Sequence, residues 1–132
     1  MQKRGHIIWA TLLVAIMLPT MGQLLQKAEQ EKRLALENSE DVQAAAQHLG
    51  NAIDCYEEAR ADGVANATIY GELGALYLQK GELGPAILNL KKALIFSPHR
   101  RSVLDNLRIA QSRRIDKYPD TQAKGALRMI AF

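Results

Sequence analysis

Residues 67–98 read ATIYGELGALYLQKGELGPAILNLKKALIFSP, and this stretch decides the fold. Apolar residues recur at three- and four-residue steps on both sides of a short break at residues 80–83, which is the pattern of two amphipathic helices. Gly81 lies in the break, where a glycine accepts the positive φ with which many helices end. Pro85 suits the first turn of the second helix, and Pro98 ends it because the residue before a proline avoids the helical region. The stretch therefore predicts an antiparallel helical hairpin.

Small and large residues alternate where the two predicted helices would meet. Small residues at three positions let two helix backbones approach, and four large side chains fill the space around them. The packing residues predicted for the hairpin, including its turn and its end, are Tyr70, Leu73, Gly74, Tyr77, Gly81, Ala86, Leu90, Ala93 and Pro98.

This set of residues resembles the motif of a tetratricopeptide repeat (TPR). That motif has an opening aromatic residue, a Leu-Gly pair, a second aromatic residue, a Gly-acid turn, alanines around a bulky residue and a closing proline. An earlier copy supports the resemblance, since residues 49–53 (LGNAI) precede residues 83–87 (LGPAI) by the 34-residue period of TPR proteins. The earlier copy has no turn glycine at residues 46–48, so its helices are expected to be longer or set at a different angle.

The remaining sequence is also expected to be helical, which gives an all-α fold. Residues 24–37 are rich in good helix formers, and a second helix is predicted from residues 38–41 to Arg60. Projecting the 34-residue period forward predicts a capping helix at residues 101–115, with Leu104 and Leu107 facing the hairpin. The predicted organisation is a leader at residues 1–22, a TPR-like domain at residues 23–115 and a basic, apolar tail at residues 116–132.

The N-terminal leader has the layout of a secretory signal peptide. Lys3 and Arg4 precede a 12-residue apolar run, and small residues before Gln23 offer a cleavage site after Gly22. The alternative is an uncleaved signal anchor. Either reading predicts an exported, periplasmic or inner-membrane-associated protein. Cys55 is the single cysteine, so it is either a helix residue or half of an intermolecular disulfide.

Charge is unevenly distributed along the chain. Residues 23–90 hold 5 basic and 11 acidic side chains, whereas residues 91–132 hold 10 basic and 3 acidic ones. The basic third is either a solvated cap and tail or a patch that contacts an acidic protein or anionic lipids. Nucleic acid is not an expected partner, because nucleic-acid binding conflicts with export.

No arrangement of residues indicates an enzyme. The three histidines are spread over separate regions, no metal-ligand spacing occurs, and no phosphate-binding loop or nucleophile motif is present. We therefore expect no catalysis, no cofactor and no metal.

The TPR resemblance implies a partner-binding groove lined by the first helix of each repeat. Carried onto this sequence, the groove residues are Thr68, Glu72, Ala75, Gln79, Asp105, Asn106, Ile109 and Arg113. Some TPR proteins grip a C-terminal carboxylate with Lys, Asn and Arg on this surface. Here Gly71 and Ala75 occupy two of those places and only Asn106 matches, so such a clamp is not expected.

Residues 50–118 resemble more narrowly the exported TPR proteins of the bacterial aerotolerance operon (the Bat family). The resemblance rests on the run LGPAILNLKKALIFSP followed by NLRIAQSRRIDKYPD. It implies a scaffold that joins proteins in the bacterial cell envelope and performs no chemistry of its own. The alternative is a membrane-anchored assembly factor for pili or outer-membrane machinery.

Overall fold

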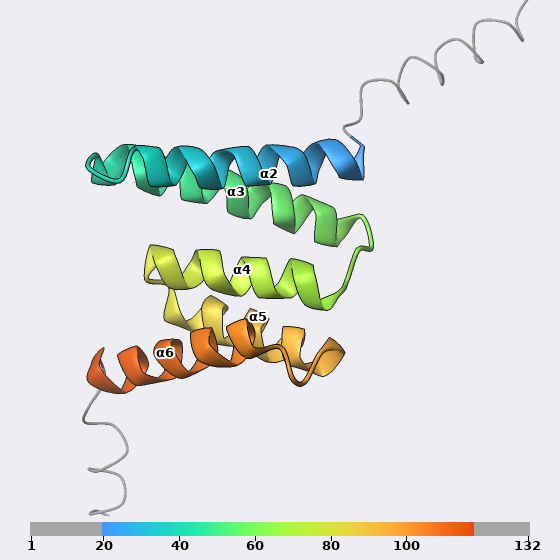
Figure 1. Ribbon diagram of the computed structural model, residues 1–132, viewed down its shortest axis with the longest axis vertical. Helices are drawn as coiled ribbons and strands as arrows, with labels where there is room; N and C mark the ends of the chain where they lie inside the picture. The colour runs from blue at the N-terminus through green and yellow to red at the C-terminus, as the bar shows by residue number, and fades with distance from the viewer. Residues whose placement is uncertain (1–19, 118–132) are drawn as a thin grey trace, which may run out of the picture.

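The computed structural model describes residues 20–117, which form five helices and no strand. Successive helices run in alternating directions, with α2, α4 and α6 in one layer and α3 and α5 in the other (Figure 1). The all-α class is thereby confirmed for the described part of the chain. The helices are α2 (Met21–Glu37), α3 (Val42–Ala61), α4 (Ala67–Lys80), α5 (Leu83–Phe96) and α6 (Arg101–Lys117).

Local sequence signals fix where the helices begin and end. Asp41 caps α3 and Asn66 caps α4, each by accepting hydrogen bonds from two backbone N–H groups of the first turn. Thr20 caps α2 in a reciprocal capping box with Gln23. Gly81 ends α4 with a φ of 81°, the left-handed conformation that glycine adopts without strain.

The α4/α5 hairpin is held by a close approach of two backbones. A Cβ atom on Gly74 would lie 2.5 Å from Cγ of Leu90 and 3.1 Å from its backbone nitrogen. Leu73, Ala86 and Leu90 are all fully buried there. Glycine is therefore the residue that lets α4 and α5 come this close.

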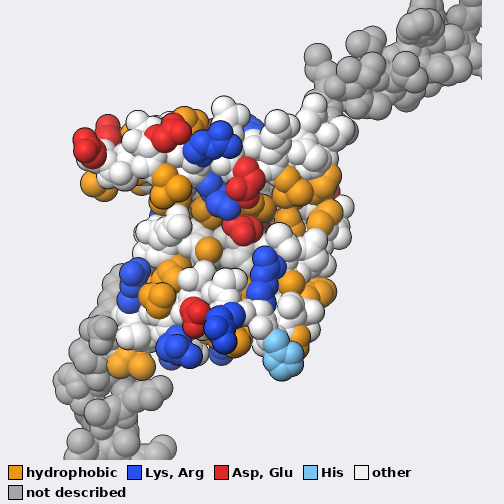
Figure 2. Space-filling view, in the orientation of Figure 1, with side chains coloured by type: hydrophobic (Ala, Val, Ile, Leu, Met, Phe, Trp, Pro, Cys, Tyr) orange, Lys and Arg blue, Asp and Glu red, His pale blue; other side chains and the backbone are white. Residues whose placement is uncertain are grey.

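The α2/α3 hairpin is longer than the second one, in agreement with the missing turn glycine. Its helices have 17 and 20 residues, whereas α4 and α5 have 14 each. The residues that would form the turn, 46–48, continue α3 instead. The end of the first hairpin consequently projects beyond α4, and Figure 2 shows a notch beneath it. Leu36 and Val42 are exposed at this projecting end.

The 34-residue period is visible in the burial of α3 and α5. Ala52 and Ala86 are both fully buried, and Ala59 and Ala93 are as well. Tyr56 occupies the place of Leu90 and is 3% exposed. Equivalent positions of the two helices thus face the core.

The capping helix α6 was predicted with one wrong contact. Leu107 lies against the core, but Leu104 is 41% exposed, while Val103 and Ala110 are buried. The reason is the direction of stacking. Val103 corresponds to Ile69, which faces the preceding hairpin, whereas Leu104 corresponds to Tyr70, on the side of α4 toward α5. No helix within residues 20–117 follows α6 to cover Leu104.

Two sequence-based predictions fall largely on residues that the structure does not describe. These are the leader, of which residues 1–19 lie outside the described range, and the tail from residue 118 onward. Within residues 20–117, none of the helices combines the length and apolar character needed to cross a bilayer.

Candidate protein-binding face

The predicted groove residues lie on α4 and α6, two neighbouring helices of one layer (Figure 1). We call the surface that α2, α4 and α6 present together the inner face. Half-buried positions on it are Glu72, Ala75 and Asn106, and exposed positions are Thr68, Gln79, Asp105, Ile109 and Arg113. The predicted residues therefore include both polar and apolar side chains.

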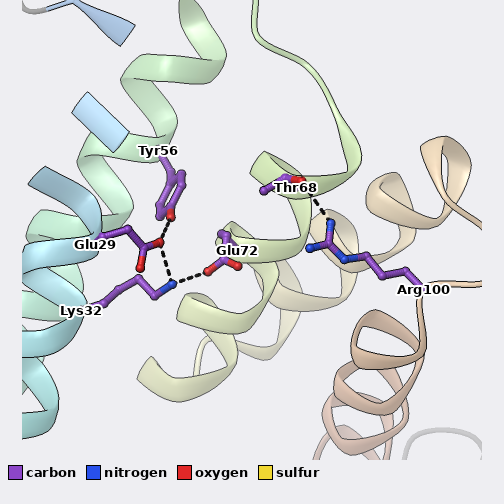
Figure 3. A network of polar contacts seen from close by, with 6 residues as sticks. All are labelled: Glu29, Lys32, Tyr56, Thr68, Glu72 and Arg100. Carbon is purple, nitrogen blue, oxygen red and sulfur yellow. Dashed lines mark hydrogen bonds and ion pairs between the residues drawn. The ribbon is translucent and has the colours of Figure 1, made fainter. Parts of the chain in front are cut away.

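Helices α4 and α6 touch directly on this face. A Cβ atom on Gly71 would lie 3.4 Å from Cγ2 of Val103, an ordinary van der Waals contact. At one end of the contact, the guanidinium of Arg100 donates a hydrogen bond to the Thr68 hydroxyl over 3.2 Å (Figure 3). Gly71 therefore lies at the contact between α4 and α6.

Helices α2 and α4 are joined differently, through long polar side chains. No Cα atom of α2 lies within 8 Å of one in α4. Lys32 spans this gap and donates a hydrogen bond of 2.6 Å to the Glu72 carboxylate (Figure 3). Both side chains are 28% exposed, so water screens this ion pair only in part.

The Lys32–Glu72 ion pair belongs to a network of hydrogen bonds that extends to α3 through Glu29. The Tyr56 hydroxyl donates a 2.6 Å hydrogen bond to the Glu29 carboxylate, which also accepts one of 3.0 Å from Lys32. These bonds, that from Tyr56 first, lower the pKa of Glu29. Burial and then the bond to Glu29 raise the pKa of Tyr56. For Lys32, burial acts downward, but hydrogen bonds to Glu72 and Glu29 outweigh it and raise its pKa.

A second polar cluster joins α2 to α3. Nδ1 of His48 lies 2.7 Å from the Glu31 carboxylate, and the Asn51 amide donates a 3.2 Å hydrogen bond to the same oxygen. The hydrogen bond with His48, more than that from Asn51, lowers the pKa of Glu31. The long first hairpin is thus braced at two places by side chains of α2.

Asp105, one of the predicted groove residues, is exposed on α6. Its carboxylate lies 3.7 Å from the guanidinium of Arg108, one turn along the same helix. Both side chains are largely exposed, so this pair links nothing beyond α6. The other predicted α6 residues, Asn106, Ile109 and Arg113, recur with Asp105 at three- and four-residue steps along the helix.

Sequence reasoning did not find Lys32, Glu29 and Arg100. Each contacts a residue from 27 to 40 positions away, and charged residues on exposed helix faces carry no periodic signal. Only Glu72, which the TPR resemblance placed in the groove, indicated where the network of Glu29, Lys32 and Glu72 lies.

The described residues hold no grouping of His, Cys, Asp and Glu that suits a metal ion. Cys55 is 5% exposed in the core, and burial raises the pKa of its thiol. A buried thiol of this kind is a packing residue, and within residues 20–117 it is poorly placed for an intermolecular disulfide.

Comparison with known proteins supplies no family assignment. The chain matches no family model, no curated protein and no solved structure.

Proposed function

We propose that this chain is a TPR-type scaffold of the bacterial cell envelope that binds a protein partner on its inner face. The observation that carries the proposal is the α4/α5 hairpin. Its backbones approach at Gly74 and Leu90, its turn is closed by Gly81, and α3 repeats its buried positions 34 residues earlier. These are the features by which TPR proteins stack helix pairs, and stacked pairs build an extended binding surface.

The inner face has the character of a protein-binding surface. It mixes an exposed apolar side chain, Ile109 at 43%, with the polar groups of Gln79, Asn106 and Arg113. The Lys32–Glu72 bridge and the Arg100–Thr68 hydrogen bond fix neighbouring segments before any partner arrives. A pre-ordered surface loses less conformational entropy on binding.

Site-specific photo-cross-linking tests this proposal. A photoreactive amino acid replaces Gln79 on the inner face in one variant and Glu58, which is exposed on α3, in another. In envelope preparations we expect a discrete cross-linked partner from position 79 that position 58 does not capture. Arg113→Glu should reduce that product, whereas Arg60→Glu, an equal charge change at an exposed position of α3 in the other layer, should not. Equal capture from positions 79 and 58 would contradict the proposal that the partner binds on the inner face.

One observation favours the membrane-anchored form of the scaffold. The proposed cleavage point after Gly22 lies within the first turn of α2, and cleavage there would remove the capping residue Thr20. Loss of a threonine cap costs about 0.5–2 kcal/mol of helix stability. We therefore propose that the leader is retained as an anchor. Intact-mass measurement of the protein from the membrane fraction tests this point, and a mature chain starting at Gln23 would contradict it.

A further inference from the structure

The outward side of α5 carries large apolar side chains that stay more than half exposed among the described residues. Leu88 is 55% exposed and Ile95 is 77% exposed, and Phe96 is still 54% exposed although one side of its ring stacks on Tyr70, with 5.7 Å between the ring centroids. Leu88 and Ile95 are seven residues apart, so two helical turns place them on one stripe. The opposite side of α5 is fully buried through Ala86 and Leu90. The exposure is therefore a property of one face of this helix.

Basic residues flank this apolar stripe, and acidic residues are absent from the surrounding sequence. Lys91 and Lys92 lie one turn from Leu88 and Ile95, and Arg101 follows at the start of α6. No Asp or Glu occurs from residue 83 to residue 104. Among the side chains of residues 20–115, neither lysine nor Arg101 forms an ion pair with an acid. Nζ of Lys92 lies 5.5 Å above the Tyr70 ring instead.

We propose that this outward face of α5 docks on an anionic membrane surface. Leu88, Ile95 and Phe96 enter the headgroup region, where an interfacial helix buries its apolar side about 5–10 Å deep. Lys91, Lys92 and Arg101 lie beside the acidic lipid headgroups, which attract basic residues near the surface. The exposed stripe thereby loses its contact with water, and the basic side chains beside it gain counter-charges.

The position of α5 makes docking compatible with partner binding. Helix α5 belongs to the layer opposite α2, α4 and α6 (Figure 1). A chain resting on a membrane through α5 would turn its inner face toward the surrounding compartment. The membrane-docking proposal rests only on side chains of α5 and on Arg101, so it holds even if the inner face binds no protein.

The test must separate docking by α5 from any binding by the apolar run of residues 7–18. The full chain therefore carries an environment-sensitive fluorophore at a single position, in a Cys55→Ala background whose helicity is checked by circular dichroism. One variant is labelled at Ile95→Cys. The matched control is labelled at Val42→Cys, an apolar residue 80% exposed on α3. Vesicles contain phosphatidylcholine alone or with phosphatidylglycerol, plus a small fraction of spin-labelled quenching lipid.

On anionic vesicles we expect the label at position 95 to shift to the blue and to be quenched, while the label at position 42 stays in water. Vesicles of phosphatidylcholine alone should give at least fivefold weaker quenching at the same lipid concentration. Each lysine near an anionic surface contributes about a fivefold change in partitioning. The pair Lys91→Gln and Lys92→Gln should therefore raise the half-saturating lipid concentration about 25-fold. The matched pair Lys27→Gln and Arg33→Gln, both exposed on α2, should leave it unchanged.

Three results would overturn the proposal. The first is a label at position 95 that stays in water while the chain is bound to anionic vesicles. The second is equal quenching on neutral and anionic vesicles. The third is a response at position 95 to polyglutamate but not to vesicles, which would identify an acidic protein as the occupant of this face.

Discussion

The two hairpins reach the same stacked arrangement by different chemistry. In the α4/α5 hairpin, Gly74 lets two backbones meet around Leu90. In the α2/α3 hairpin, side chains of α2 reach out to Tyr56, His48 and α4 instead. Close packing is sensitive to volume, whereas partly exposed polar bridges are sensitive to charge and pH. A change of side-chain volume should therefore destabilise mainly the α4/α5 hairpin, whereas a change of charge or pH should destabilise mainly the α2/α3 hairpin.

The largest expected effect is from Gly74→Ala in the second hairpin. The new Cβ atom would lie 2.5 Å from Cγ of Leu90 and 3.1 Å from its backbone nitrogen, so α4 and α5 must separate. Overpacking of this kind costs about 1–3 kcal/mol, which exceeds the gain in helix propensity. A fall in the free energy of unfolding, measured with urea, is the expected outcome.

The matched control is Gly50→Ala in the first hairpin. A Cβ atom on Gly50 would meet nothing within 4 Å, and the residue lies inside α3. This variant should gain about 0.5–1 kcal/mol, because alanine loses less backbone entropy than glycine in a helix. If both variants shift stability in the same direction, the contrast between the hairpins does not lie in the backbone approach at Gly74.

The next effect is from Tyr56→Phe, which keeps the buried ring and removes its hydroxyl. The lost hydrogen bond to Glu29 is 2.6 Å long, and the Glu29 side chain is 56% exposed, so water can replace the donor. We expect a loss of about 1 kcal/mol in the free energy of unfolding. Tyr77→Phe on α4 removes a longer bond of 3.3 Å to Glu57 and should cost less than half as much. Equal losses of unfolding free energy would show that the short Tyr56–Glu29 hydrogen bond stabilises the fold no more than the longer Tyr77–Glu57 bond does.

Acid should weaken the first hairpin through Glu29 and Glu31. Both pKa values are lowered in the fold from the ordinary value of 4.5. A carboxyl group with a lowered pKa contributes its stabilisation in full above 4.5, and that contribution is lost as pH falls through the folded pKa. The urea midpoint should therefore drop between pH 5 and pH 3. The drop should be smaller in the double variant Glu29→Gln and Glu31→Gln, and an unchanged drop would assign acid sensitivity to other groups.

Much of the second hairpin could be predicted from sequence because its signals are local. Gly81 marks a left-handed helix end, and Pro85 and Pro98 mark the limits of α5 within a single stretch of residues. The small residues predicted at helix contacts, Gly74 and Ala86, are those that the structure buries. The 34-residue spacing extended this prediction to α3, where the alanines of α5 recur as the buried residues Ala52 and Ala59.

The rest depends on contacts that have no local signal. The Lys32–Glu72 bridge joins residues 40 positions apart, and either side chain alone reads as an ordinary exposed charge. Leu104 was assigned to the core because the period gives the position of a residue in a repeat but not whether a following helix exists to cover it. Part of the candidate inner face was thus predictable, while the bonds that fix its geometry were not.

The smallest effect, and the sharpest test of the first hairpin, is the coupling energy between Lys32 and Glu72. A double-mutant cycle with Lys32→Met and Glu72→Gln isolates this pair from the bond between Lys32 and Glu29. Since the two groups lie 2.6 Å apart and are each 28% exposed, the coupling should be about 0.5–1 kcal/mol.

The same cycle on Asp105 and Arg108 is the matched comparison within α6. These groups are 3.7 Å apart, and their side chains are 53% and 82% exposed, so water and salt screen them fully. Their coupling should be about 0–0.3 kcal/mol and should vanish at 1 M salt, where the Debye length is about 3 Å. The Lys32–Glu72 coupling should persist in part at that salt concentration, because burial limits screening. Equal coupling in the two cycles would mean that α2 is not tied to α4 through Lys32, and that the spacing of these helices on the inner face is set by α3 alone.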